Sequence, residues 1–264
     1  MPKTRKKSPR SRVERVVEYI APPQPPQSKT PTLLVILLIV ISFFTGYLFF
    51  KVRSLEQTTG LGGVPPPLRQ APVSPTELKI KKPETSEHWR GDKNVRYVWV
   101  EYSDLECPFC KKVHPDMQKL LQEYKGRIAW VYRHFPLGFH QNAQKEGEAT
   151  ECAAELGGND AFWKYTDMLF ERTTSNGTGF ALDKLVPLAG ELGLNQTAFK
   201  QCLDSGKYEK KVKDDVQEGS RAGVGATPTG VIFDLQTGKT QVVEGAVPYE
   251  QLKQAVDDFL TKNK

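Results

Sequence analysis

The chain of 264 residues contains few of the groups that hold a metal ion. It has four histidines and four cysteines, and Cys107 and Cys110 are the one pair separated by two residues. A structural zinc site needs four ligands, usually from two such pairs or from one pair and a histidine pair. No H-x(3–5)-H pair stands in a suitable context, and Cys152 and Cys202 are isolated in the sequence. The sequence therefore argues against zinc, and we expect no metal.

The chain also lacks an excess of positive charge beyond its first thirty residues. Of its 37 basic and 31 acidic residues, eight basic and two acidic residues lie in 1–30, which leaves 29 of each in 31–264. The net charge of +6 is thus a property of the N-terminal tail, which is basic and rich in proline. A neutral folded part offers no basic face to a nucleic acid, so we expect no nucleic-acid partner.

Charged residues are absent from residues 33–50, which read LLVILLIVISFFTGYLFF. Together with Pro31 and Thr32 this run is long enough to cross a membrane as a helix. A cleaved signal peptide usually has a shorter apolar region, and no small-residue cleavage site follows Phe50. The lysines and arginines before the run place the N-terminus in the cytoplasm. The sequence predicts a single-pass anchor over 31–51, with the rest of the chain outside the cytoplasm.

The part that follows the anchor divides into a spacer and a folded domain. Residues 52–90 include GLGGVPPPLRQAPVSP, a stretch of glycine and proline with few apolar residues to bury, which is typical of an extended linker. Residues 91–264 carry the regular apolar patterns of a folded domain. No internal repeat is visible in the sequence.

Apolar periodicity predicts the order of the elements in this domain. RYVWVEYS is rich in β-branched and aromatic residues and predicts a buried strand over 96–103. A helix follows over about 107–126 and a second strand over 128–135, so a parallel pair with a right-handed crossover is expected. Residues 141–222 have helical spacing throughout. The C-terminal part predicts a hairpin over 231–245 and an amphipathic helix over 248–263.

The pair Cys107 and Cys110 falls where the first predicted strand meets a helix N-terminus. A CxxC pair is either half of a metal site or a redox couple. Because the chain has too few suitably spaced ligands for a zinc site, the redox couple is favoured. Unpaired N–H groups and the helix dipole favour a thiolate at this place. We expect Cys107 to be the exposed nucleophile and Cys110 the resolving thiol. Pro108 suits the first helical turn because its missing N–H would have no partner there.

Several motifs resemble one known family. EYSDLECPFC, YRHFPLGFH, ATECAAELGGNDAFWKYTDMLF and GVGATPTGVIF occur in this order and resemble the DsbA-like branch of the thioredoxin superfamily. The resemblance covers about Gly91 to the C-terminus. It implies an α/β thioredoxin fold with a helical insertion at about 141–222, and the order of elements predicted above gives the same layout.

The resemblance also implies roles for residues around the dithiol. Pro228 matches a proline that takes the cis form opposite the dithiol, although most X-Pro bonds are trans. The backbone of Thr227 would pair with an extended substrate strand, next to Pro108 and Phe109. Glu101 matches a buried carboxylate that relays protons to the resolving cysteine; the alternative is a solvated acid on a strand edge. Phe109 stands where the most oxidising members have histidine.

Two further pairs of residues lie in the domain. Cys152 and Cys202 are either inert buried thiols or a structural disulfide, and the even number of cysteines in an extracytoplasmic domain favours the disulfide. Asp104 and Glu106 are expected to be solvated acids in a loop. The histidines of the domain receive no role.

These observations predict an extracytoplasmic thiol:disulfide oxidoreductase that introduces disulfides into exported proteins. No diffusible cofactor is implied, because both electrons reside on the sulfurs of Cys107 and Cys110. The family implies re-oxidation by a membrane partner of the DsbB or VKOR kind, and a monomer is expected because the spacer leaves no room for a dimerisation domain. The alternatives are a reductase or isomerase that uses the same dithiol, and a non-catalytic binding module in which the pair is a permanent staple.

Overall fold

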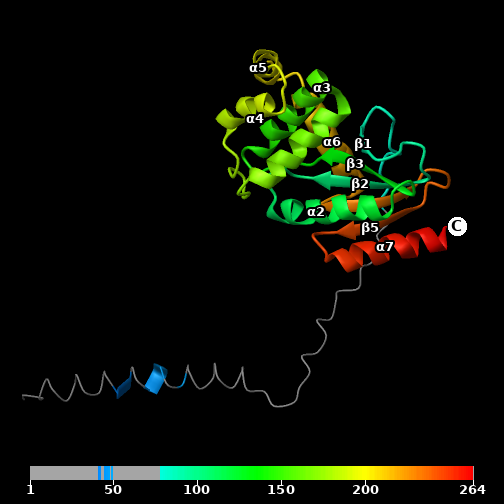
Figure 1. The fold of residues 1–264 in the computed structure, drawn as a ribbon. Helices are drawn as coiled ribbons and strands as arrows, with labels where there is room; N and C mark the ends of the chain where they lie inside the picture. Colours follow the sequence, from blue (N-terminus) through cyan, green and yellow to red (C-terminus); the bar gives the residue numbers. More distant parts are fainter. Residues whose placement is uncertain (1–40, 43–44, 48, 50–77, 264) are drawn as a thin grey trace, which may run out of the picture. The chain divides into compact units, whose positions relative to one another are not determined.

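The computed structural model describes residues 41–42, 45–47, 49 and 78–263 (Figure 1). The described residues between 41 and 49 are helical. The predicted tail and most of the predicted anchor and linker lie outside the described residues. In the part of the chain that is described, no helix is long and apolar enough to cross a membrane.

Five strands form one mixed sheet in the order β1-β3-β2-β4-β5. The parallel pair is formed by β2 and β3, as predicted, and the other neighbouring strands are antiparallel. The predicted hairpin is also confirmed, as β4 and β5. The bounds of the strands are β1 His88–Arg90, β2 Tyr97–Ser103, β3 Ile128–His134, β4 Thr229–Asp234 and β5 Thr240–Glu244.

The helices confirm the predicted insertion between the two halves of the sheet. Figure 1 shows α3, α4 and α5 gathered beside the sheet, between β3 and β4 in the chain. Within the predicted helical segment, α3 is interrupted at Gly158, whose φ of 72° and ψ of −169° are not helical. The bounds are α2 Pro108–Glu123, α3 Ala143–Arg172, the 3-10 helix η1 Leu182–Lys184, α4 Leu185–Glu191, α5 Gln196–Asp204, α6 Glu209–Ala222 and α7 Tyr249–Lys262.

Apolar side chains cover both faces of the sheet because successive residues of a strand point to opposite sides. On β2, Trp99 joins the core that contains residues of α2, α3 and α7 together with Cys110. Val98 and Val100 join the second core, which includes Val131 of β3 and Phe233 of β4. The central strands are therefore apolar on both faces, and a polar residue on β2 becomes buried whichever way it points.

The folded unit begins earlier than predicted. Strand β1 pairs antiparallel with β3, and Leu78 and Ile80 are buried in the second core. Glu84 accepts a hydrogen bond from the indole of Trp89 at 2.7 Å through its backbone oxygen. The predicted boundary at Gly91 is thus too late. A strand of three residues is too short to show a clear alternation of polar and apolar residues, so it cannot be recognised from the sequence without its partner strand.

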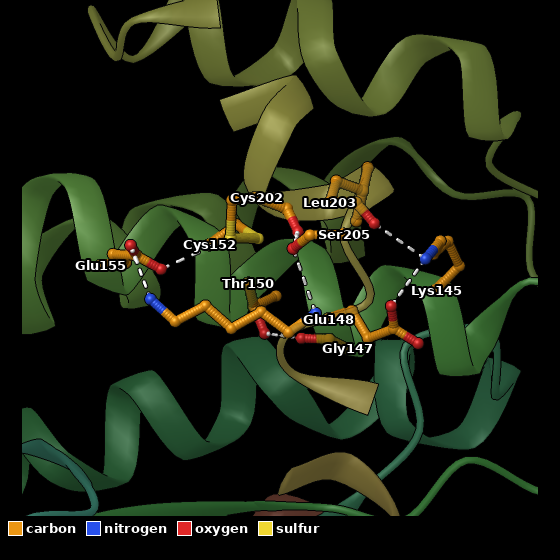
Figure 2. Close-up of a disulfide and its surroundings, with 10 residues drawn as sticks. Lys145, Gly147, Glu148, Thr150, Cys152, Glu155, Cys202, Leu203 and Ser205 are labelled. Carbon is orange, nitrogen blue, oxygen red and sulfur yellow. Dashed lines mark hydrogen bonds and ion pairs between the residues drawn. A yellow bond between two sulfur atoms is a disulfide. The ribbon is translucent and has the colours of Figure 1, made fainter. Parts of the chain in front are cut away.

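The insertion is closed by a disulfide between Cys152 of α3 and Cys202 of α5, with 5.9 Å between the Cα atoms (Figure 2). Beside it, Lys145 donates hydrogen bonds to the carboxylate of Glu148 at 2.7 Å and to the backbone oxygen of Leu203 at 3.0 Å. The predicted disulfide is confirmed, and the remaining two cysteines are free thiols.

Candidate active site

The free thiols lie at the start of α2, where the sequence predicts them. Cys107 is the N-cap residue with extended backbone angles (φ −79°, ψ 122°), and Pro108 is the first helical residue. The backbone N–H of Lys111 donates to the oxygen of Cys107 at 3.0 Å and closes the first turn. The N-cap position directs the unpaired N–H groups of this turn toward the side chain of Cys107.

A second loop covers Cys107. The Thr227–Pro228 peptide bond is cis, as predicted, and the backbone oxygen of Thr227 lies 3.5 Å from the sulfur of Cys107. As a result Cys107 is only 3% exposed, and the expectation of an exposed nucleophile is wrong. Cys110 is fully buried, so Cys107 is still the more accessible of the two sulfurs.

The two thiols have opposite acidities because their surroundings differ. A hydrogen bond with the Cys110 thiol lowers the pKa of Cys107 to about 6; burial opposes this effect, and backbone N–H groups of Cys110 and Phe109 add to it. Burial raises the pKa of Cys110 well above that of an ordinary thiol, and the nearby sulfur of Cys107 raises it further. Near neutral pH the reduced pair therefore consists of a Cys107 thiolate and a Cys110 thiol.

Glu101 is buried beneath the dithiol rather than solvated at a strand edge. It is 1% exposed on β2, and neither carboxyl oxygen has a hydrogen bond to another described residue. Burial raises its pKa to about 7, while Ser103 and Trp130 oppose the rise. Its negative charge in turn raises the pKa of Cys110. The two groups therefore affect each other's protonation.

Two acids that the sequence analysis placed in solvent are also buried, which corrects that expectation. Asp104 and Glu106 are 1% and 0% exposed. Asp104 accepts hydrogen bonds from the backbone N–H of Leu137 and from Nδ1 of His140, both at 2.7 Å. Acids in a loop are solvated by default, and only contacts with residues more than thirty positions away bury these two.

Two large aromatic side chains, one at the start of α2 and one between β3 and α3, face solvent. Phe109, between the cysteines, is 60% exposed. Phe139 is 73% exposed in the segment between β3 and α3, and the sequence analysis did not single it out. The signal was present in the motif YRHFPLGFH, where Phe139 follows Pro136 and Gly138 outside any apolar periodicity.

A buried strand-to-helix dithiol that faces a cis-proline, on a mixed sheet with a helical insertion, defines a thioredoxin-fold protein. The sequence profile of the family described as Thioredoxin matches residues 84–258. The chain belongs to this family, and its domain is that of a DsbA-like thiol:disulfide oxidoreductase.

Solved structures have a similar fold. The crystal structure of Pseudomonas aeruginosa DsbA2 is 31% identical and has a TM-score of 0.59, with 67% of this chain and 97% of that chain covered. The structure of oxidised BdbD from Bacillus subtilis is 21% identical with a TM-score of 0.58 and covers 70% of this chain and 99% of that chain, and so shows the fold alone.

Among curated proteins, the chain is similar to parts of larger transporters. It is 31% identical over 154 residues to the Na(+)/H(+) antiporter NhaA 3 of Salinispora tropica, and 29% identical over 201 residues to NhaA of Herminiimonas arsenicoxydans. The matches cover 58% and 75% of this chain but only 22% and 29% of the antiporters. The chain therefore spans less than a third of the length of these relatives.

Proposed function

We propose that the protein is an extracytoplasmic dithiol oxidase that introduces disulfides into exported proteins. The observation that carries the proposal is the difference in acidity between Cys107 and Cys110. A thiolate that is stabilised at Cys107 favours the reduced form of the pair, and a couple with a stable reduced form is a strong oxidant.

In the proposed reaction a thiolate of the substrate attacks the sulfur of Cys107. The Cys107–Cys110 bond breaks, a mixed disulfide with the substrate forms, and Cys110 leaves as a thiolate that takes up a proton. The second thiol of the substrate loses its proton and attacks the substrate sulfur of the mixed disulfide. The substrate disulfide forms, the bond to Cys107 breaks, and Cys107 leaves as a thiolate. The substrate is thereby oxidised by two electrons, and the enzyme keeps both electrons as the reduced Cys107/Cys110 pair.

Glu101 is proposed to supply and accept the proton of Cys110. Cys110 leaves as a strong base inside the core and needs a donor, and the carboxylic acid of Glu101 is a buried neighbour. A pKa of about 7 allows Glu101 to act as an acid in this step and as a base when the enzyme is re-oxidised.

Substrate is proposed to bind across the cis-proline loop. The backbone of Thr227 lies beside the sulfur of Cys107, where an added strand would bring its own cysteine within reach. The exposed rings of Phe109 and Phe139 supply apolar contacts, which suit unfolded chains that expose apolar residues. Pro108 is exposed beside Phe109 and belongs to the same surface.

The proposed location is the outer side of a membrane, with residues 31–51 as the anchor and residues 1–30 in the cytoplasm. The Cys152–Cys202 disulfide supports this location because disulfides persist outside the cytoplasm. The proposed redox partner is a membrane protein of the DsbB or VKOR kind, which the anchor would keep nearby. The proposed assembly is a monomer.

The deciding experiment is an equilibrium titration of the full chain against glutathione buffers that follows Cys107 and Cys110, with a C107S/C110S variant as control for the other pair. We expect a potential near that of DsbA, about −120 mV. A value near about −270 mV would instead indicate a reductase, and resistance to reduction below about −300 mV would indicate a structural staple and refute the enzyme.

A further inference from the structure

The segment that joins α3 to η1 is attached to the residues on either side of the dithiol. We refer to residues 173–180 as the 173–180 loop. The backbone oxygen of Glu106, the residue before Cys107, accepts a hydrogen bond from Asn176 N–H at 2.8 Å. Lys111, the residue after Cys110, donates from Nζ to the backbone oxygens of Glu171 at 3.1 Å and of Thr173. The helical insertion therefore contacts the active-site motif at both of its ends.

The carboxylate of Glu106 is the centre of this attachment. Each of its two oxygens accepts two hydrogen bonds, so all four acceptor positions of an ionised carboxylate are used. The donors are Thr173 Oγ1 at 2.9 Å and Phe180 N–H at 2.8 Å to Oε1, and Gly177 N–H at 3.0 Å and Gly179 N–H at 2.7 Å to Oε2.

The loop has a backbone that depends on this partner. Ser175, Asn176 and Gly177 have φ angles of 64°, 67° and 96°. Left-handed backbone is uncommon at serine, whereas asparagine and glycine tolerate it better. Such conformations persist when the surroundings over-determine them. A side chain on Gly179 would place its Cβ 2.1 Å from the nitrogen of Ser175. The loop is thus wrapped tightly, with its N–H groups converging on the buried carboxylate.

A second buried acid, Glu146 of α3, completes the arrangement. It is fully buried, and its carboxyl oxygens have no hydrogen-bond donor among the described residues. Burial raises the pKa of Glu146 to about 10, and the neighbouring carboxylates of Glu106 and Asp104 add to the rise. Burial opposes the charge of Glu106, but the N–H groups of Gly179 and Phe180, the Thr173 hydroxyl and the neighbouring Glu146 outweigh it, so the pKa of Glu106 lies below its usual range. The two acids therefore hold one proton between them, on Glu146.

We propose that Glu106 is a positioning residue of the dithiol, which holds the 173–180 loop against the turn that begins α2. The proposal rests on the proposed redox function of Cys107. The same turn contains the hydrogen bonds from Glu106 N–H to Asp104 Oδ1 at 2.8 Å and from Cys107 N–H to the Asp104 oxygen at 3.1 Å. A turn held in this way keeps the sulfur of Cys107 close to the N–H groups that stabilise its thiolate.

The test replaces each acid by its amide in the full-length protein. In Glu106→Gln, one oxygen becomes an NH2 group that faces two donors, so two hydrogen bonds to the loop are lost. We expect alkylation of Cys107 at pH 5.5 to slow about threefold to tenfold, because less thiolate forms. The equilibrium with glutathione should shift by the same factor toward the oxidised protein, with a tenfold change equal to about 30 mV.

Two matched variants separate this role from a loss of charge or of packing. Glu146→Gln keeps a neutral donor beside Glu106, and Glu148→Gln alters a buried acid of the same helix whose bonds are to Gln144 and Lys145. We expect both to retain Cys107 reactivity within about twofold of the original protein, since neither removes an acceptor from the loop. A loss in Glu146→Gln equal to that in Glu106→Gln would overturn the assignment of the proton to Glu146.

Two results would overturn the proposal as a whole. One is a folded Glu106→Gln protein with the original pH profile of Cys107, and the other is a faster alkylation, which would mean that the charge alone matters. If Glu106→Gln does not fold, Thr173→Val removes one donor and should slow alkylation in the same direction. An unchanged Thr173→Val rate then overturns the proposal. Resistance of the original protein to glutathione would refute the proposed function instead.

Discussion

At the scale of single residues, the chemistry of this protein depends on where protons reside. The helix start and the Cys110 thiol stabilise a thiolate at Cys107, whereas Cys110 has neither exposure nor a favourable charge nearby. Burial raises the pKa of Glu101 to about 7 and outweighs the opposing effects of Ser103 and Trp130. Each of the three groups therefore has a protonation state that its environment, rather than its residue type, decides.

The first prediction concerns the pH dependence of Cys107. The pKa of this thiol is lowered to about 6, so the thiolate is present above that pH and is lost as the pH falls through it. The alkylation rate of the reduced protein should therefore reach half of its maximum near pH 6. Iodoacetamide labelling followed by mass spectrometry of the Cys107 peptide measures it. A midpoint between pH 8 and 9, as for a free thiol, would contradict the structure.

The second prediction concerns Glu101. Glu101→Gln cannot exchange a proton, so attack by Cys110 on a Cys107–glutathione mixed disulfide should slow about tenfold to a hundredfold at pH 7. Release of glutathione in a stopped-flow experiment measures this step. Alkylation of Cys107 at pH 8 serves as the control and should change little. If glutathione is released at the original rate, Glu101 is not the proton carrier.

At the scale of elements, the position of each part is decided by what packs on the faces of the sheet. Strand β2 places Trp99 against one core and Val98 and Val100 against the other, and Glu101 follows Trp99 on its face. Helix α2 then covers that face and brings Cys110 above Glu101. The insertion is held by its own disulfide and reaches the dithiol through the 173–180 loop.

A close approach between β4 and β2 gives the third prediction. A Cβ atom on Gly230 would lie 2.1 Å from Cζ2 of Trp99, inside a core where the indole has no space to move. Gly230→Ala should lower the free energy of unfolding by about 1–3 kcal/mol through overpacking. Gly138→Ala is the matched control, because its Cβ would meet no atom within 4 Å. Urea unfolding of both variants decides the prediction, and equal midpoints would count against it.

The structural disulfide gives the fourth prediction. Cys152 and Cys202 close a loop with a sequence separation of 50. Replacing both with alanine should reduce stability by roughly 4 kcal/mol in the chain-entropy model. Thermal unfolding measures the loss, and the glutathione potential of Cys107 and Cys110 should stay the same because the two pairs lie in different elements. Loss of dithiol exchange in a folded variant would show that the pairs are coupled.

At the scale of the whole molecule, charge and hydropathy separate the chain into parts with different tasks. The positive excess is confined to residues 1–30, and an uncharged apolar run follows directly. The described domain contains the dithiol, the cis-proline loop and the 173–180 loop. The proposed topology assigns the basic tail to the cytoplasm and this domain to the opposite side.

The fifth prediction tests that topology. The full chain should sediment with membranes and resist extraction by carbonate, whereas a variant that lacks residues 1–51 should be soluble. Protease added outside spheroplasts should digest the domain and leave the tail. The full chain and the truncated variant should show the same glutathione potential, since the dithiol and its neighbours lie within residues 78–263. A full chain that stays in the supernatant would refute the anchor.

The sequence by itself determined most of the elements and the dithiol, because the signals for these are local. Alternation, helical spacing and Pro108 at a helix start are properties of short segments, and they place Cys107 and Cys110 correctly without any knowledge of neighbours. The crossover rule then gave the parallel pairing of β2 and β3. The motif resemblance added the cis form of Pro228, which no local rule predicts.

Only the tertiary structure decided which polar groups are buried. Asp104 and Glu106 are expected in solvent from the sequence, but Leu137 and His140 bond to the carboxylate of Asp104, and the 173–180 loop closes over Glu106. No prediction is made for Glu146, which is buried as well. Strand β1 likewise exists as a strand through its bonds to β3. Burial results from contacts with distant parts of the chain. The pKa shifts that burial causes can therefore be predicted only from the folded structure.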